Sequence, residues 1–305
     1  MIHFDPRWSG PHGIGRFSDE VVSRLGEASP LRFGVDKLSL LDPLATTLAA
    51  MRLRSGVYFT PGFNPPLRSA VPFVFCIHDL IHLRFAAEST PVRRAYYRLV
   101  VGPAAKRAAR VITVSEHARG EILEWTKLPA ERVVVAGNGV AAAFKPDGGR
   151  HDPGHPYFLF VGRRAAHKNV ERLVAAHAAS RCGREVRLLF TGDLEDEQLA
   201  AHYRGAVALA FPSLYEGFGI PIVEAMACGT PVLTSNATAI PETAGEGNAL
   251  FVDPLSIESI AAGLDRLADD AALRADLRQR GLARAAAFSW DKVAEKVGRV
   301  LRENF

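Results

Sequence analysis

The chain has 305 residues, of which 48% are hydrophobic and 23% charged, as in an ordinary globular protein, and this length predicts two domains. Its three cysteines lie far apart without a CxxC pair, which argues against a disulfide framework or a cysteine zinc site. The first residues lack a signal-peptide pattern, and no apolar run approaches the roughly 20 residues that cross a bilayer, so we expect a cytoplasmic protein.

Short strand-like runs alternate with helical patterns in the first half of the chain. A strand at 2–4 leads into a glycine-rich loop at 10–15 and then into a helix with one apolar side. Further strands are expected at 31–35, 57–59, 73–77 and 111–114. Strands that alternate with helices are typical of parallel βαβ construction.

The polar, Pro- and Gly-rich segment 150–156 marks the expected boundary between a domain at 1–150 and a domain at 151–290. After it, strands are expected at 157–161, 186–191, 207–211, 232–234 and 249–252, with helices from 169 and at 195–203, 256–268, 271–288 and 291–302. The simplest α/β architecture is two Rossmann-like domains that face each other. Such sheets bind ligands beyond the carboxyl ends of their strands, so the site is expected in the cleft between the domains.

The most informative stretch is 211–231, FPSLYEGFGIPIVEAMACGTP. A buried strand precedes a loop, Pro221 stands where a helix would begin, and Gly229 stands where it would end. This order aims backbone N–H groups and the positive end of a helix dipole at whatever occupies the loop, which predicts an anion site. Glu216 in the loop and Glu224, expected in the first turn of the helix, would flank that site.

Glu216 and Glu224 resemble the Glu-x7-Glu signature of the retaining glycosyltransferases of family 4, or group 1, which have the two-domain GT-B fold. Further matches follow in the order of the family: GPHGIGRF, FCIHDL, VITVSEHARGEI, GNGV, VGRRAAHKN and PETAGEGNALFVDP. They spread over nearly the whole chain. The resemblance implies an enzyme that transfers a sugar from a nucleoside-diphosphate sugar.

The resemblance also implies roles for residues of the second domain. Glu216 would contact the hydroxyls of the donor sugar, and Glu224 would hold the ribose of the nucleotide. Backbone N–H groups around Phe218, Gly219 and Ile220 would hold the diphosphate.

Charge on the leaving diphosphate would be neutralised by Arg163 and Lys168. No cofactor and no metal is expected in this role, since the chain has no Asp-x-Asp triplet to hold a metal. The second domain departs from the family in one respect, because between Asn169 and Tyr203 it offers one helix and one strand where an additional strand–helix unit is usual. His167 also replaces the Arg that many members have before the lysine.

In the first domain, the resemblance places His78 over the donor sugar. Gly13 and Gly15 would border the acceptor and the phosphate, with Asp79 also on the acceptor side. The spacing His78-Asp79-x-x-His82 resembles a metal site, but it follows a strand instead of lying on one helix face. The terminal helix, 291–305, would pack back on the first domain.

The basic residues concentrate in the first half of the chain. Residues 1–150 contain 20 Lys or Arg and 13 Asp or Glu (+7), and the remainder contains 17 and 20 (−3). Between Glu88 and Glu116 there is no acid, and Tyr96 and Tyr97 lie among six basic residues, Arg93, Arg94, Arg98, Lys106, Arg107 and Arg110. This stretch is either a patch that docks on an anionic membrane or an ordinary helix with a solvated basic face. No nucleic-acid-binding motif accompanies it, so nucleic acid is not an expected partner.

Other functions are compatible with parts of the sequence. Gly10, Gly13 and Gly15 partly imitate a dinucleotide fingerprint, but the last spacing is wrong for a nicotinamide oxidoreductase. Sugar-nucleotide 2-epimerases share the architecture but lack the Glu-x7-Glu helix. A non-catalytic subunit that binds a sugar nucleotide stays open as an alternative.

The prediction is therefore a metal-independent, retaining glycosyltransferase. The IHDL strand end resembles bacterial mannosyltransferases of polysaccharide and O-antigen assembly, which favours GDP-mannose as the donor, with UDP-sugars as the alternative. The expected acceptor is a glycan or a lipid-linked glycan, with peripheral attachment to the inner face of the membrane as an open option.

Overall fold

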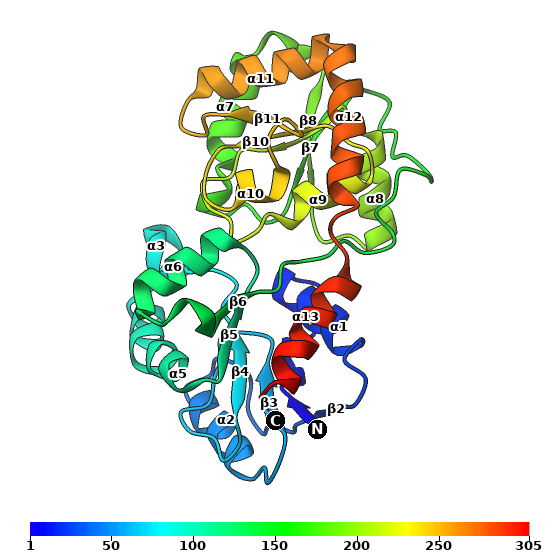
Figure 1. Ribbon diagram of the computed structural model, residues 1–305. Coiled ribbons are helices and arrows are strands. Elements are labelled where there is room, and N and C mark those ends of the chain that lie inside the picture. Colours follow the sequence, from blue (N-terminus) through cyan, green and yellow to red (C-terminus); the bar gives the residue numbers. More distant parts are fainter. Residues whose placement is uncertain (305) are drawn as a thin grey trace. The chain divides into compact units, whose positions relative to one another are not determined.

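The computed structural model describes residues 1–304. The chain folds as two compact units, one formed by Met1–Gly139 together with the segment from Trp290 onward, and the other by Val140–Ser289. Each unit is an α/β layer structure around a parallel sheet (Figure 1). Within the described residues, no helix combines the length and apolarity needed to cross a bilayer.

The division between the units falls earlier than the predicted boundary at 150–156. Arg204 donates hydrogen bonds to the carbonyl groups of Lys145 and Gly149, at 3.2 and 2.7 Å. His151 stacks on His202 with 3.9 Å between the ring centroids. These contacts attach the connecting segment to the second unit, so the break comes after Gly139.

The sheet of the first unit has six strands, among residues 1–139 and 290–304, in the order β2-β1-β3-β4-β5-β6. They are β1 (Ile2–Phe4), β2 (Ala28–Pro30), β3 (Val57–Thr60), β4 (Phe73–Cys76), β5 (Arg110–Thr113) and β6 (Val133–Val135). The central strands β3 and β4 are buried along their whole length, which is why they are continuous apolar runs in the sequence.

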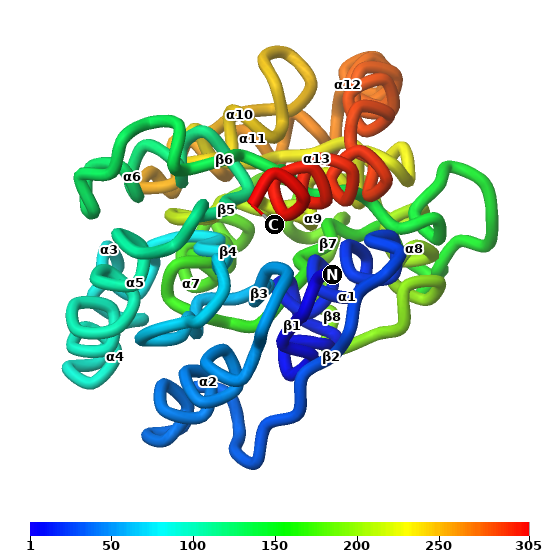
Figure 2. The backbone as a smooth tube through the Cα atoms, turned by 60° about the horizontal axis from the view of Figure 1, so that its bottom comes forward, coloured from blue at the N-terminus to red at the C-terminus, as the bar shows by residue number. Residues whose placement is uncertain are grey.

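Helices cover both faces of this sheet (Figure 2). They are α1 (Gly13–Val22), α2 (Asp42–Met51), α3 (Ile81–Arg84), α4 (Pro91–Tyr96), α5 (Gly102–Arg107), α6 (Glu116–Thr126) and α13 (Trp290–Arg302), with a π-helical segment at Tyr97–Val101. The last helix, α13, lies beside α1: the rings of Phe17 and Trp290 are 6.3 Å apart, and Arg24 forms a 2.7 Å ion pair with Asp291.

The expected strand at 31–35 is wrong. The second strand ends at Pro30, after pairing Ile2 with Ala28 in register. The residues after it contact Arg7. The guanidinium of Arg7 donates a 3.1 Å hydrogen bond to the carbonyl of Val35 and lies 3.8 Å from the ring centroid of Phe33. Residues 31–35 therefore pack against a charged side chain and do not pair with a neighbouring strand.

The second unit contains a five-stranded parallel sheet within Val140–Ser289, in the order β11-β10-β9-β7-β8. Its strands are β7 (Tyr157–Val161), β8 (Arg187–Thr191), β9 (Ala208–Phe211), β10 (Val232–Ser235) and β11 (Leu250–Val252). Its helices are α7 (Val170–Ala179), α8 (Asp196–Gly205), α9 (Ile220–Ala227), α10 (Ile240–Ala244), α11 (Ile257–Asp269) and α12 (Ala271–Ala285). Strands β7 and β9 are neighbours, so the loops that follow them open at the same edge of the sheet.

Candidate active site

The loop between β9 and α9 ends in a left-handed residue. Gly219 has a φ of +96°, which side chains rarely allow, and α9 begins at the next residue with Pro221 in its first turn. Among the hydrogen bonds between residues 1–304, none uses the amide N–H of Phe218, Gly219 or Ile220. These N–H groups stand at the positive end of the α9 dipole and are suited to an anionic ligand.

Lys168 and Glu216 form an ion pair, with 2.7 Å between Nζ and Oε1. Lys168 ends the short helical turn 166–168 after β7, and Glu216 lies in the β9–α9 loop, so the pair joins the ends of two neighbouring strands. The side chains are only 16% and 12% exposed. Removing two charges from water to this degree has a desolvation cost that is about as large as the attraction between them. The pair therefore contributes little to stability, which points to a function.

Two hydroxyl groups hold the Glu216 loop. Ser213 Oγ lies 2.7 Å from Glu216 Oε1 and 3.0 Å from the carbonyl oxygen of His167, so its proton has two acceptors within reach. Thr238 Oγ1 accepts a 3.0 Å hydrogen bond from the amide N–H of Glu216. Neither residue was predicted from the sequence. Ser213 stands within the FPSLYEGFG motif, which was the available signal, whereas Thr238 comes from a loop after β10 and had none.

Glu224 is buried, with 4% of its surface exposed. Its Oε2 accepts a 2.9 Å hydrogen bond from the hydroxyl of Tyr203, at the end of α8. The expectation that Glu224 lies in the first turn of its helix is wrong, because α9 begins at Ile220 and Glu224 is in the second turn. Tyr203 was also missed, since nothing in its own segment marks it as the partner of a carboxylate.

Arg163 stands apart from the Lys168–Glu216 pair. It follows Gly162, which has a φ of +112°, and its side chain is exposed. No contact among the described residues joins it to Lys168 or Glu216. The neighbouring Arg164 instead lies over the ring of Phe190, with 4.4 Å from its guanidinium carbon to the ring centroid.

In the first unit, the predicted site residues Gly13 and Gly15 lie at the start of α1. The amide N–H of Gly15 donates a 2.9 Å hydrogen bond to His12 Nδ1, which caps α1, so that amide is already engaged. A Cβ atom on Gly15 would lie 2.1 Å from the carbonyl oxygen of Gly10, so this position requires glycine. Gly13 is the exposed first residue of α1.

His78 follows β4 and packs edge-on against Phe17, with ring centroids 4.9 Å apart. Its Nε2 lies 2.8 Å from the carbonyl oxygen of Pro61, so Nε2 carries the proton and donates it. Burial lowers the pKa of His78 to about 4, partly offset by the bond to Pro61 and reinforced by the nearby His12. The imidazole is therefore neutral near pH 7.

The other groups of the His78-Asp79-x-x-His82 motif are used within the chain. Asp79 Oδ1 accepts from the amide N–H of Ile81 at 3.0 Å, and His82 Nδ1 lies 2.9 Å from the carbonyl oxygen of Glu88. Within residues 1–304, no three His, Cys, Asp or Glu side chains are grouped so that they could share a metal ion. The expectation of a metal-independent reaction stays a prediction.

The basic stretch 89–115 forms α4, the π-helical segment and α5. Arg93, Arg94 and Arg98 are exposed, as the interpretation of a basic surface requires. The tyrosines do not belong to that surface, because Tyr97 is 1% exposed and the hydroxyl of the partly buried Tyr96 donates to the carbonyl of Phe63 at 3.3 Å.

Two family models match the chain. One, described as glycosyl transferases group 1, matches residues 177–284, and the other, a glycosyl transferase 4-like domain, matches residues 24–139. The first lies within the second unit and the second within the first unit.

Several of the curated relatives are mannosyltransferases by name. The O-antigen chain mannosyltransferase B of Escherichia coli is 27% identical over 298 residues, which cover 84% of this chain and 77% of the relative. The MMP alpha-(1->4)-mannosyltransferase of Mycolicibacterium hassiacum is 32% identical, covering 67% of this chain and 57% of the relative. The chain spans about a third of the serotype-specific mannosyltransferase WbdA of Escherichia coli, to which it is 27% identical.

Solved structures share the fold. A sucrose-phosphate synthase from Thermosynechococcus elongatus superposes with a TM-score of 0.75 at 21% identity, covering 99% of this chain and 98% of the other. At that identity the likeness concerns the fold alone, which is two parallel-sheet α/β domains of the GT-B type. Because the two family models match the two units in chain order and the fold agrees with them, the chain belongs to the group 1 glycosyltransferases.

Proposed function

We propose that this glycosyltransferase moves a mannosyl residue from GDP-mannose to a glycan or lipid-linked acceptor, with retention of configuration and without a metal ion. The observation that carries the proposal is the Lys168–Glu216 pair, largely buried at the same sheet edge as the unengaged amide groups at the start of α9. The mannosyltransferases among its relatives support the choice of sugar, and UDP-sugars are the alternative donors.

The chemistry requires charge to be stabilised on the leaving group. Breaking a glycosyl–phosphate bond builds negative charge on the diphosphate and positive charge on the sugar. The N–H groups of residues 218–220 and the cation of Lys168 would stabilise the former, with Arg163 as a second cation. Fixed dipoles of this kind lower the barrier because they need no reorientation during the reaction.

The carboxylates would hold the sugar nucleotide. Glu216, oriented by Ser213, would accept hydrogen bonds from the hydroxyls of the sugar. Glu224 would accept hydrogen bonds from the ribose hydroxyls in place of the one that it accepts from Tyr203. His78 is neutral, so it can meet a sugar hydroxyl through Nδ1 without placing a positive charge beside the developing oxocarbenium ion. Gly13 and Asp79 would lie on the acceptor side.

A donor panel tests the proposal. Thermal unfolding is measured with GDP-mannose, UDP-glucose and dTDP-glucose, and a donor at one hundred times its Kd should add about 2.7 kcal/mol to the free energy of unfolding. The largest shift is expected with GDP-mannose. A larger shift with a UDP-sugar would replace the proposed donor.

Turnover separates the enzyme from a non-catalytic binding subunit. The purified chain is mixed with its donor and a mannose-containing oligosaccharide, and release of the nucleoside diphosphate is followed with and without EDTA. Equal rates in the two samples are expected, and the anomeric coupling in the NMR spectrum of the product reports retention. If the chain binds the donor but releases no nucleoside diphosphate with any acceptor, it is not a catalyst.

A further inference from the structure

Helix α2 lies at the periphery of the first unit (Figures 1 and 2), and its apolar side chains are exposed. Its outward side chains and those of the preceding turn are 50–92% exposed: Leu40 92%, Leu41 59%, Leu44 55%, Leu48 58% and Met51 50%. At about 100° per residue Leu44, Leu48 and Met51 fall within one arc of about 60°, and Leu40 and Leu41 lie in the turn that leads into the helix. Exposed leucines scattered singly are ordinary, whereas four leucines and a methionine close together form a surface that needs an explanation.

The inward face of α2 is the polar one. Asp42 and Thr46 are fully buried, as is Ala50 in the third turn. A helix on the surface of a globular protein normally has the opposite arrangement, with its apolar stripe toward the core. The orientation of α2 is therefore not set by its own hydrophobicity.

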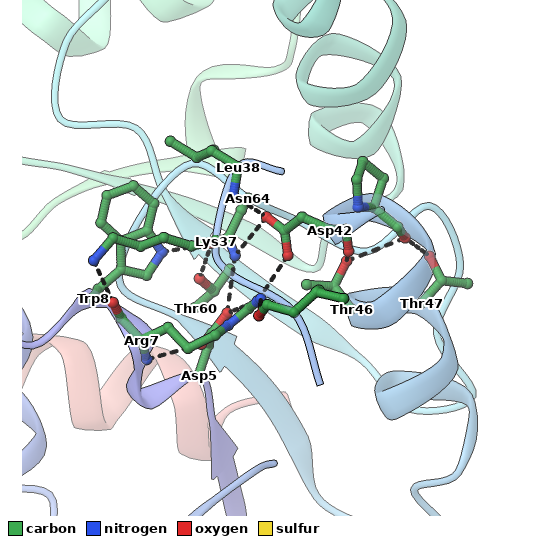
Figure 3. Close-up of polar contacts among 12 residues, drawn as sticks. Asp5, Arg7, Trp8, Lys37, Leu38, Asp42, Thr46, Thr47, Thr60 and Asn64 are labelled. Carbon is green, nitrogen blue, oxygen red and sulfur yellow. Dashed lines mark hydrogen bonds and ion pairs between the residues drawn. The ribbon is translucent and has the colours of Figure 1, made fainter. Parts of the chain in front are cut away.

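A buried polar network sets the orientation instead (Figure 3). Asp42 Oδ1 forms a 2.9 Å ion pair with Arg7, and Asp42 Oδ2 accepts from the amide N–H of Leu38 at 2.7 Å and from Asn64 Nδ2 at 3.3 Å. Arg7 also pairs with the buried Asp5 at 2.6 Å. Turning the leucines inward would leave the buried carboxylate of Asp42 without these partners, which costs more than the leucines gain.

The charges directly after α2 are basic. Arg52 and Arg54 are both exposed there, and Asp36, before the turn that leads into the helix, is an exposed acid nearby in the sequence. The one acidic residue of α2, Asp42, is buried against Arg7 and offers no charge to the outside. The outward surface thus combines an apolar stripe with cations at its end, which is the combination that anionic lipid head groups attract.

We propose that the outward face of α2, defined by Leu40, Leu41, Leu44, Leu48 and Met51, inserts into the interfacial region of an anionic bilayer. The helix lies in the plane of the interface, its leucines reach past the head groups, and Arg52 and Arg54 remain among the phosphates. The inference deepens the proposed function, since a lipid-linked acceptor is held at a membrane surface, but it does not depend on which sugar is transferred.

Flotation of the full chain with vesicles tests the inference. The vesicles contain phosphatidylcholine alone or with 30% phosphatidylglycerol, at low and at physiological salt. Wild type should float with the anionic vesicles, and the triple variant Leu40→Ser, Leu44→Ser, Leu48→Ser should bind at least about tenfold more weakly. The matched control is Leu255→Ser, a 67% exposed leucine of the second unit, which should bind like wild type.

A fluorescence measurement separates insertion from charge attraction alone. A tryptophan at Leu44→Trp should shift to the blue on anionic vesicles and be quenched by brominated acyl chains. The inference is overturned if wild type does not bind anionic vesicles at low salt, or if the leucine variant binds as well as wild type. It is also overturned if only the triple variant Arg93→Gln, Arg94→Gln, Arg98→Gln abolishes binding, because the surface of α4 and the π-helical segment would then be the docking site.

A second copy of the chain is the competing occupant of this face. Analytical ultracentrifugation that shows a dimer of wild type and a monomer of the leucine variant, without vesicle binding, would assign the face to self-association and reject the membrane. Transfer to a water-soluble acceptor is measured in parallel. A leucine variant that keeps this transfer while losing vesicle binding fails only in docking, whereas a wild-type chain without transfer fails in its proposed function.

Discussion

Lys168 Nζ lies 2.7 Å from Glu216 Oε1, although 48 residues separate the two in the chain. The pair exists because β7 and β9 are adjacent in the parallel sheet and both residues follow the carboxyl ends of these strands. A cation and a carboxylate are thereby held beside the start of α9, where an anionic leaving group would be stabilised.

Replacing the carboxylate tests the pair directly. Glu216→Gln should lower kcat/KM by roughly 10²–10³, because an amide neither anchors Lys168 nor accepts strong hydrogen bonds from a sugar hydroxyl. Initial rates with GDP-mannose are measured on protein whose circular dichroism matches wild type. The control is Glu258→Gln, an exposed carboxylate at the start of α11, which should keep full activity. Near-normal rates for Glu216→Gln would remove Glu216 from the site.

The hydrogen bond from Tyr203 to Glu224 predicts a change in stability. Tyr203→Phe removes a donor from a buried carboxylate, so the free energy of unfolding in urea should fall by about 1–3 kcal/mol. The KM for the donor should change as well if Glu224 holds the ribose. Tyr157→Phe is the matched control, since its hydroxyl bonds to the carbonyl of His202 at 2.8 Å, and it should leave KM unaltered.

Gly15 is expected to tolerate no side chain. In Gly15→Ala the new Cβ would lie 2.1 Å from the carbonyl oxygen of Gly10, so the loop must shift, at a cost of about 2–4 kcal/mol. Gly120→Ala, within α6 and with open space around it, should be neutral or stabilising by up to about 1 kcal/mol. Differential scanning calorimetry should order the Tm values accordingly, and equal Tm values would contradict the geometry.

The buried His78 predicts a loss of stability in acid. Burial lowers its pKa to about 4, below the value of about 6.5 in an unfolded chain, so the unfolded state binds more protons between these two values. The free energy of unfolding should therefore fall as the pH drops from 6.5 toward 4, by up to about 3 kcal/mol from this group.

His78→Gln should flatten that slope, since glutamine can still donate to Pro61 but takes up no proton. Urea unfolding of both proteins is compared at intervals from pH 8 to pH 4.5. Near pH 8 the difference between their free energies of unfolding should not change with pH, because the imidazole is neutral in both the folded and the unfolded state there. Parallel curves down to pH 4.5 would show that His78 is not the group responsible.

Several features of this protein follow from the sequence alone. The buried strands at 57–60, 73–76 and 157–161 are almost wholly apolar runs, the pattern that burial on both faces of a parallel sheet favours. The loop before α9 and the start of that helix depend on neighbours in the chain, so Pro221 and the motif around it were sufficient to predict the start to within one residue.

Other features depend on contacts between segments far apart in the chain. The residues after β2 contact Arg7 and form no strand, although the sequence pattern predicted one at 31–35. Helix α2 turns its leucines outward because Asp42 is held by Arg7, and the hydrophobic pattern of the sequence did not mark this helix.

The sequence by itself determined the family, the alternation of strands and helices, and the glutamates of the candidate site. Only the tertiary structure decided that Lys168 meets Glu216, that Tyr203 holds Glu224 and that His78 is neutral. The physical reason is that a local pattern fixes backbone conformation, whereas the charge state and the partner of a side chain depend on burial and on segments brought close by the sheet.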